Sequence, residues 1–214
     1  MQCSKCRADT VVFQPYSGQH LCREHFILDF EAKAKRTIRQ HQWMQPGDCI
    51  AVALTGNSAD NALLFFFQKL TAKRRDIRVT GIPVAKKTPD LMAAACDAGA
   101  TRIALATGLE ATAASMLADI LRGDVGNSIR NGTTSVPLEV ISPFCHIPAG
   151  EIATYARING IEGSISSIMQ DDDPLLMDVN IMLAGYTQRH PGAPHAILNL
   201  CHTIGQSVRH DRNI

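Results

Sequence analysis

The chain has 214 residues, of which 45% are hydrophobic and 19% are charged, a composition typical of a folded globular protein rather than a disordered one. Its 21 Lys and Arg residues and 20 Asp and Glu residues leave a net charge of +1, which excludes a globally basic nucleic-acid coat protein but not a local basic face. The longest apolar run, at residues 62–67, is far shorter than the roughly 20 residues of a membrane span, and the polar N-terminus does not resemble a secretory signal. We therefore expect a cytoplasmic protein with no membrane segment.

The N-terminal segment carries a C-x2-C-x15-C-x2-H pattern, formed by Cys3, Cys6, Cys22 and His25. Two short pairs at this separation are typical of zinc ribbons. Zinc prefers four tetrahedral ligands, and four protein ligands leave no open position for catalysis. Because the segment has too few apolar residues for a core, bound metal would supply its folding free energy. The pattern therefore predicts a zinc-binding module over residues 1–28 with structural Zn²⁺, the alternative being four reduced side chains without a metal.

Apolar residues recur at helical spacing over residues 26–45, which predicts a helix, and residues 29–46 are expected to form a connecting helix. The opposite face of this helix is basic, with Lys33, Lys35, Arg36 and Arg39. Such a face is either simply solvated or in contact with an RNA backbone, and both interpretations stay open. The same two interpretations apply to the basic residues 73–75.

Strands and helices alternate from residue 47 to residue 214. Strands are predicted at residues 49–54, 77–84, 102–106 and 136–141, and helices at 58–70, 88–98, 110–122, 148–158, 174–188 and from about 195. The alternation predicts an α/β domain with a mostly parallel, Rossmann-like sheet, in which ligands bind near the carboxyl ends of the strands. We interpret Asp173 before Pro174 as a helix N-cap rather than part of a metal site, and Cys96 as a buried core thiol.

The first strand of this domain leads into a helix through a loop of small and polar residues, at residues 55–60. Backbone N–H groups and the helix dipole at such a turn can cradle a phosphate. The loop has neither the P-loop nor the dinucleotide-binding pattern, and Asn57 or Ser58 can instead serve as an N-cap.

The order of these features resembles the tRNA 2-thiolation branch of the PP-loop ATPases. The similar segments are residues 3–25, 14–18, 36–39, 47–56, 106–108, 121–124 and 147–156. The resemblance implies a HUP-type fold, ATP on the loop, adenylation of a tRNA uridine and displacement of AMP by sulfur carried on two cysteines, often with an iron–sulfur cluster. It also implies tRNA or a protein as partner, and allows a homodimer. The candidate nucleotide-binding residues are Ala53, Thr55, Gly56, Asn57, Ser58, Asp60 and Gly108.

The chain departs from that family where the family does its chemistry. Ser58 and Ala59 replace the lysine and the aspartate of the SGGKDS loop, and residues 107–113 lack the histidine and the aspartates of the family's ATGHNLDD segment. The central C-x2-C insert is missing, and residues 168–171, where the second catalytic cysteine would fall, contain no cysteine. We therefore expect no catalytic residue and no iron–sulfur cluster, with ATP or AMP as a ligand that the scaffold still allows.

These departures favour a degenerate, non-thiolating homologue that acts as a binding or partner protein and keeps nucleotide or tRNA binding. The alternative is an active ATP-dependent tRNA-modifying sulfurtransferase whose missing thiols come from a partner or sulfur carrier. A third hypothesis is a different nucleotide-linked activity, or an adenylate sensor, on the same scaffold.

Overall fold

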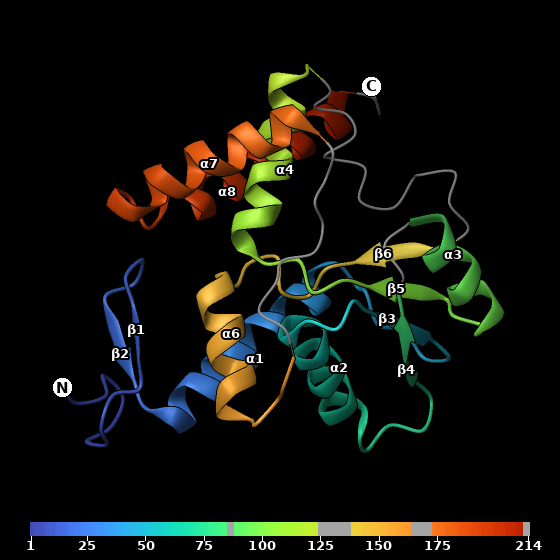
Figure 1. Ribbon diagram of the computed structural model, residues 1–214, viewed down its shortest axis with the longest axis horizontal. Coiled ribbons are helices and arrows are strands. Elements are labelled where there is room, and N and C mark those ends of the chain that lie inside the picture. Colours follow the sequence, from blue (N-terminus) through green and yellow to red (C-terminus); the bar gives the residue numbers. More distant parts are fainter. Residues whose placement is uncertain (85–87, 124–137, 164–172, 212–214) are drawn as a thin grey trace.

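The computed structural model describes residues 1–84, 88–123, 138–163 and 173–211 (Figure 1). Four sequence expectations fall wholly or partly outside these ranges. They are the start of the strand at 136–141, the end of the similar segment at 121–124, the cysteine-free stretch at 168–171, and Asp171 and Asp172, which with Asp173 form the alternative metal site before Pro174.

The N-terminal part is a two-stranded hairpin followed by a long helix. Strands β1 (Val12–Gln14) and β2 (Gln19–Leu21) pair antiparallel, and the turn between them contains Gly18 with a φ of 66°. Helix α1 (Arg23–Gln40) begins directly after Cys22 and ends before Gln42, which has a φ of 55°. The helix therefore begins three residues earlier than the apolar pattern predicts and ends five residues earlier, at a left-handed residue.

The central sheet has four strands, all parallel, in the order β4-β3-β5-β6. The strands are β3 (Cys49–Leu54), β4 (Arg78–Pro83), β5 (Arg102–Ala104) and β6 (Glu139–Ile141). Along β3, Ile50 and Val52 pack into one hydrophobic cluster, while Ala51 and Ala53 pack into another. Because alternate side chains of a strand face opposite sides, β3 is buried on both faces. The predicted parallel α/β sheet is confirmed.

The helices form three groups, two of which cover the faces of the sheet. The remaining helices are α2 (Ser58–Thr71), α3 (Thr88–Asp97), α4 (Leu109–Leu121), α6 (Ala149–Ile158), α7 (Pro174–Arg189) and α8 (Ala193–Asp211). Helices α1, α2 and α6 share the largest core with Ile50 and Val52, and residues of α3 pack with Ala51 and Ala53 on the other face. Helices α4, α7 and α8 form a separate bundle with its own core, at the top of Figure 1.

One local expectation is confirmed in this arrangement. The carboxylate of Asp173 accepts hydrogen bonds from the backbone of Leu175 and Leu176, and thus caps α7. Phe66 and Phe67 are fully buried in the core that α2 shares with α1 and α6. None of the described helices combines the length and the apolar character that a membrane crossing requires.

A buried carboxylate joins the three helices of the largest core. Glu31 on α1 is 5% exposed and accepts hydrogen bonds from Lys35, from Lys69 on α2 and from the hydroxyl of Tyr155 on α6. Burial raises the pKa of Glu31, but the hydrogen bonds and charges of the two lysines outweigh this effect and lower it overall. The ring of Tyr155 stacks on Phe30 with centroids 4.0 Å apart, so the polar contact and the aromatic core fix each other.

We predict that Glu31→Gln lowers the free energy of unfolding by about 1–3 kcal/mol, because the two lysines lose their carboxylate while remaining partly hydrated. Since the folded-state pKa is depressed, the stabilisation is complete above the ordinary glutamate pKa of about 4.3 and is lost as the pH falls through the lower folded value. Urea unfolding across this pH range measures the difference. Glu24→Gln, at an exposed position of the same helix, is the control and should change stability little at any pH; equal effects of the two variants would contradict the assignment.

Candidate functional site

The four predicted metal ligands converge at the N-terminus. Cys3 and Cys6 lie before β1, Cys22 follows β2, and His25 stands in the first turn of α1. Their ligand atoms all lie within 4.8 Å of one another. The Sγ atoms of Cys6 and Cys22 are 3.7 Å apart, and Nδ1 of His25 lies 3.3 Å from Sγ of Cys22 and 3.6 Å from Sγ of Cys3. A tetrahedral ion with bonds of about 2.3 Å has ligand–ligand edges of about 3.8 Å, so the donors fit a metal centre.

The electrostatics of this cluster also favour a cation. Burial opposes ionisation of Cys3, but backbone hydrogen bonds, including one from the N–H of Lys5, outweigh it and lower the pKa of that thiol to about 6. Thiolates are the metal-binding form of cysteine. Because three thiols crowd together with no side-chain cation among the ligands, a bound metal is the group that would balance their negative charge.

Residues of the N-terminal module and of α1 contact both ends of helix α6. The hydroxyl of Tyr16 donates to Oε1 of Glu151 at 2.6 Å, and Nζ of Lys33 lies 3.1 Å from Oε2 of Glu151 and 2.7 Å from Oδ2 of Asp29. At the other end, Arg23 donates to the carbonyl of Ile158 at 3.0 Å. The contacts with α6 join residues more than 100 positions apart, so the local sequence pattern gave no signal for them. The ion pair between Asp29 and Lys33 lies within α1.

The four candidate RNA-binding residues of α1 fall into two kinds. Lys33 and Lys35 lie in ion pairs with buried or half-buried carboxylates. Arg36 and Arg39 are exposed, and no ion pair involves either side chain among the described residues. RNA contact by this face stays a prediction.

In the loop after β3, the carboxylate of Asp60 accepts the hydrogen bonds that Thr55 can donate. Its Oδ2 accepts hydrogen bonds from the backbone N–H of Thr55 at 2.8 Å and from the hydroxyl of Thr55 at 2.6 Å. Asn57 caps α2 by accepting from the N–H of Asp60 at 2.7 Å, and donates to the Thr55 hydroxyl. Asp60 is 6% exposed. The loop therefore holds an anionic group of its own where a phosphate cradle would present free donors.

Residues 160–163 cover the outer side of this loop. A Cβ built on Gly163 would lie 2.5 Å from the backbone nitrogen of Ser58, so only a glycine fits at this approach. The side chain of Asn61 donates to the carbonyl of Glu162 at 2.8 Å and holds the segment in place. The sequence offered no signal for this cover, since it depends on a contact between residues about a hundred positions apart.

The start of α4, where the candidate nucleotide-binding residue Gly108 lies, is also in contact with the protein's own atoms. Gly108 is the N-cap of α4, and a Cβ there would lie 3.0 Å from Ile152 and 3.2 Å from the carbonyl of Ile147. The N–H of Leu109 donates to that same carbonyl at 2.9 Å. Gly108 thus serves close packing between α4 and the segment before α6. Ala53, the remaining candidate, is buried inside β3.

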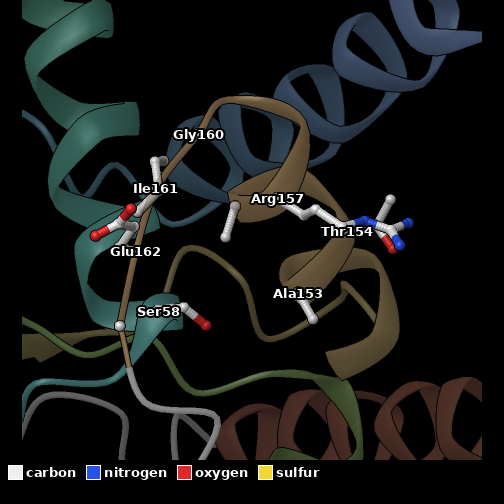
Figure 2. A pocket seen from close by; sticks show the side chains of 9 residues that line it. Ser58, Ala153, Thr154, Arg157, Gly160, Ile161 and Glu162 are labelled. Carbon is white, nitrogen blue, oxygen red and sulfur yellow. The ribbon is translucent and has the colours of Figure 1, made fainter.

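A hollow of about 600 Å³ lies between α2 and α6 (Figure 2). Its lining includes Ser58, Thr154 and Arg157 together with residues 160–163. Figure 2 shows Ile161 and Glu162 on the segment that passes along α2 to its first turn, where Ser58 stands. Among the residues that the structure describes, the lining includes neither cysteine nor histidine, so these residues supply neither a thiol nucleophile nor an imidazole base.

The cysteines of the α/β body belong to different parts of the fold: Cys49 begins β3, Cys96 lies on α3, Cys145 lies between β6 and α6, and Cys201 lies on α8. Cys96 is exposed on α3, which corrects the expectation of a buried core thiol: α3 is amphipathic, and Leu91 and Ala95 occupy its buried face instead. Cys145 is buried, and burial raises its pKa to about 12, so it remains a neutral thiol. Among the described residues, the N-terminal cluster is the one group of Cys, His and acidic side chains that converges well enough to bind a metal.

Comparison with known proteins gives partial matches in sequence. The family model described as "2-thiouridine synthetase TtuA, N-terminal LIM domain" matches residues 2–27. Cytoplasmic tRNA 2-thiolation protein 1 of Anopheles gambiae is 35% identical over 71 residues, which are 33% of this chain and 20% of that protein. The tRNA 2-thiolation protein NcsA of Haloferax volcanii is 44% identical over 48 residues, 22% of this chain and 15% of that protein. The aligned parts amount to about a fifth or less of the length of these relatives.

A solved structure matches almost the whole fold. The U34-tRNA thiolase NcsA from Methanococcus maripaludis, with its [4Fe-4S] cluster, superposes with a TM-score of 0.78 over 96% of this chain and 87% of that chain. The two sequences are 13% identical, so this likeness concerns the fold.

This neighbour corrects the expectation about cofactors. The spacing of the N-terminal ligands favoured Zn²⁺, and the missing C-x2-C insert and second catalytic cysteine argued against an iron–sulfur cluster, yet the structural neighbour is an NcsA that holds a [4Fe-4S] cluster. A site built from three cysteines and one histidine is chemically suited to zinc or to an iron–sulfur centre, because both bind thiolate and imidazole ligands. Ligand count and spacing alone did not discriminate between the two.

We predict that the purified chain carries metal at this cluster and that Cys6→Ser removes most of it, since one lost thiolate opens the site. Elemental analysis of anaerobically prepared protein measures zinc and iron together, and visible absorption reports thiolate-bound iron. Cys96→Ser, which removes an exposed cysteine far along the chain, is the control and should keep the metal content. Wild-type metal content in Cys6→Ser would contradict the assignment.

The match at the N-terminal module, the partial identities to two tRNA 2-thiolation proteins and the shared fold point in the same direction. The chain is therefore similar to tRNA 2-thiolation proteins over its N-terminal module and short aligned segments, and it shares the fold of one of them.

Proposed function

We propose that this chain is a non-thiolating relative of the tRNA 2-thiolation enzymes, which binds tRNA without inserting sulfur into it. The observation that carries the proposal is the carboxylate of Asp60, which accepts both hydrogen bonds that Thr55 can offer to an anion. A triphosphate at this loop would have to displace a buried, hydrogen-bonded carboxylate of the same charge sign.

The surroundings of the loop support the same conclusion. Gly163 packs on the first turn of α2, and the Ile147 carbonyl accepts from the N–H of Leu109 at the start of α4. The N–H of Ala149 at the start of α6 donates to Glu110 at 2.8 Å. Three helix starts that ordinarily attract phosphates are thus supplied with protein oxygen or covered by backbone.

The tRNA part of the proposal comes from the relatives, whose names describe tRNA thiolation. We also propose that the chain consists of a metal-binding module at residues 1–28 and an α/β domain of the PP-loop type at 47–214. The connection at 29–46 is helical only up to Gln40, where α1 ends. We place the protein in the cytoplasm, as the name of the Anopheles relative places that protein.

A thiolation assay tests the proposal directly. We expect that the purified, metal-loaded chain, incubated with tRNA, ATP and a sulfide donor, forms no 2-thiouridine, because no thiolate and no open phosphate cradle meet at the loop. Mass spectrometry of nucleosides from the digested tRNA is the measurement. ATP-dependent 2-thiouridine above the level of a reaction without protein would overturn the proposal.

A second experiment tests the closed loop itself. Asp60→Ser releases the N–H and the hydroxyl of Thr55 and removes one negative charge, so we expect inorganic pyrophosphate to bind at least about tenfold more tightly than to the wild type. Isothermal titration calorimetry measures both affinities. Asp97→Ser removes an exposed carboxylate at the end of α3 and should leave pyrophosphate binding unchanged. Tight binding by the wild type, or no gain in Asp60→Ser, would show that Asp60 does not close the loop.

A further inference from the structure

Several of the described cations without an ion-pair partner lie at one edge of the sheet. Helix α1 leads into the amino end of β3, and α2 leads into the amino end of β4. The two connections are tied together, since the N–H of Gly47 donates to the carbonyl of Asp76 at 2.7 Å and the N–H of Arg78 donates to the carbonyl of Asp48 at 2.9 Å. One turn earlier, Lys35 and Lys69 bind the same Glu31. The ends of α1 and α2 therefore present their side chains at one common edge.

We name this surface the basic edge. It comprises Lys35, Arg36, Arg39, Lys69, Lys73, Arg74, Arg75 and Arg78. The acidic side chains in contact with it are Glu31, shared by two of the lysines, and Asp76, which pairs with Arg74. Because the whole chain has a net charge of +1, the rest of the protein is net negative and the positive charge is segregated here.

The pairing of cations differs between this edge and other parts of the described chain. Lys33, Arg102 and Arg122 each bind two acidic groups. Single arginines without an ion pair among the described residues also occur elsewhere, at Arg7, Arg23, Arg157 and Arg189, but on separate parts of the chain. At the basic edge, five side chains are exposed and take part in no ion pair among the described residues: Arg36, Arg39, Lys73, Arg75 and Arg78. Like charges held together without partners repel each other, so this arrangement is best neutralised by an external polyanion.

The chemistry of the edge favours RNA over an acidic protein. Protein interfaces have an apolar core, yet none of the large hydrophobic side chains that are exposed belongs to residues 35–48 or 69–78, all of which the structure describes. Arginine guanidinium groups form paired hydrogen bonds with phosphate oxygens, and protein–nucleic acid interfaces are polar and strongly positive. A phosphate backbone fits both the lack of exposed large hydrophobic side chains at residues 35–48 and 69–78 and the number of arginines there.

The basic edge is also separate from the loop at residues 55–60. The loop follows the carboxyl end of β3, whereas the basic edge lies at the amino ends of β3 and β4. We propose that the basic edge binds the phosphate backbone of an RNA, independently of the closed loop. This inference rests on the proposed function in taking tRNA as the ligand, and it adds the surface that holds it.

Salt-dependent binding of fluorescently labelled tRNA, measured by anisotropy on the full chain, tests the proposal. The combined variant Arg36→Gln, Arg39→Gln and Arg75→Gln should weaken binding at least about tenfold at fixed salt and reduce the slope of log K against log salt by about two to three, since each lost phosphate contact removes about one unit. Arg39→Gln alone should reduce the slope by about one. These side chains are exposed and form no ion pair with any residue that the structure describes, so the variants should keep the wild-type circular dichroism and melting temperature.

The matched control is Arg189→Gln, because Arg189 and Arg39 are both exposed arginines in the last turn of a helix. It should retain the wild-type affinity and slope. If tRNA binds the wild type and the triple variant alike, the basic edge is refuted while tRNA binding by the chain stands. If the wild type binds no tRNA even at low salt, both this inference and the tRNA part of the proposed function are refuted. Formation of 2-thiouridine bears only on the loss of catalysis.

Discussion

A carboxylate that is buried in this protein must receive hydrogen bonds from the protein itself, and this requirement organises the structure. Glu31 lies where α1, α2 and α6 meet, and each of the three helices supplies it with a donor. An unpaired carboxylate at this place would cost several kcal/mol, so the three helices are held in one relative arrangement. The core around Phe30 and Tyr155 then packs in the space that this arrangement leaves.

The same requirement explains why the loop after β3 looks like a phosphate site and yet is closed. Its backbone has the ingredients of an anion cradle, with Gly56 at a φ of 88° and a helix start behind it. Asp60 lies on the first turn of that helix and reaches back to Thr55. An internal anion therefore receives the donors that an external phosphate would need. Since the carboxylate is covalently tethered, it has no entropy of association to overcome, and an external ligand competes with it at a disadvantage.

Sequence reasoning succeeded where the signal is local and failed where it depends on distant contacts. The alternation of apolar runs predicts the parallel sheet, because buried β3 needs helices on both faces. The spacing of the cysteines predicts a metal centre, because a turn brings the pairs together. Spacing did not distinguish zinc from an iron–sulfur centre, since both take the same donors. It also left open whether Asn57 acts as a cap or a phosphate ligand, because that choice depends on Asp60 and on Gly163, which is about a hundred residues away.

The local sequence pattern did not predict which side chains are buried and which are exposed. Cys96 has apolar neighbours in sequence and was expected in the core, but a short amphipathic helix buries only one stripe, and Leu91 and Ala95 take it. Lys33 belongs to the basic face of α1, yet it points to Asp29 and Glu151 and ties the module to α6. Arg36 and Arg39, on the same helix, are exposed and have no such partner within the described part of the chain. The basic residues of α1 therefore have two different roles. The positions of carboxylates distant in sequence decide which cations form ion pairs that stabilise the fold and which remain available to bind a phosphate.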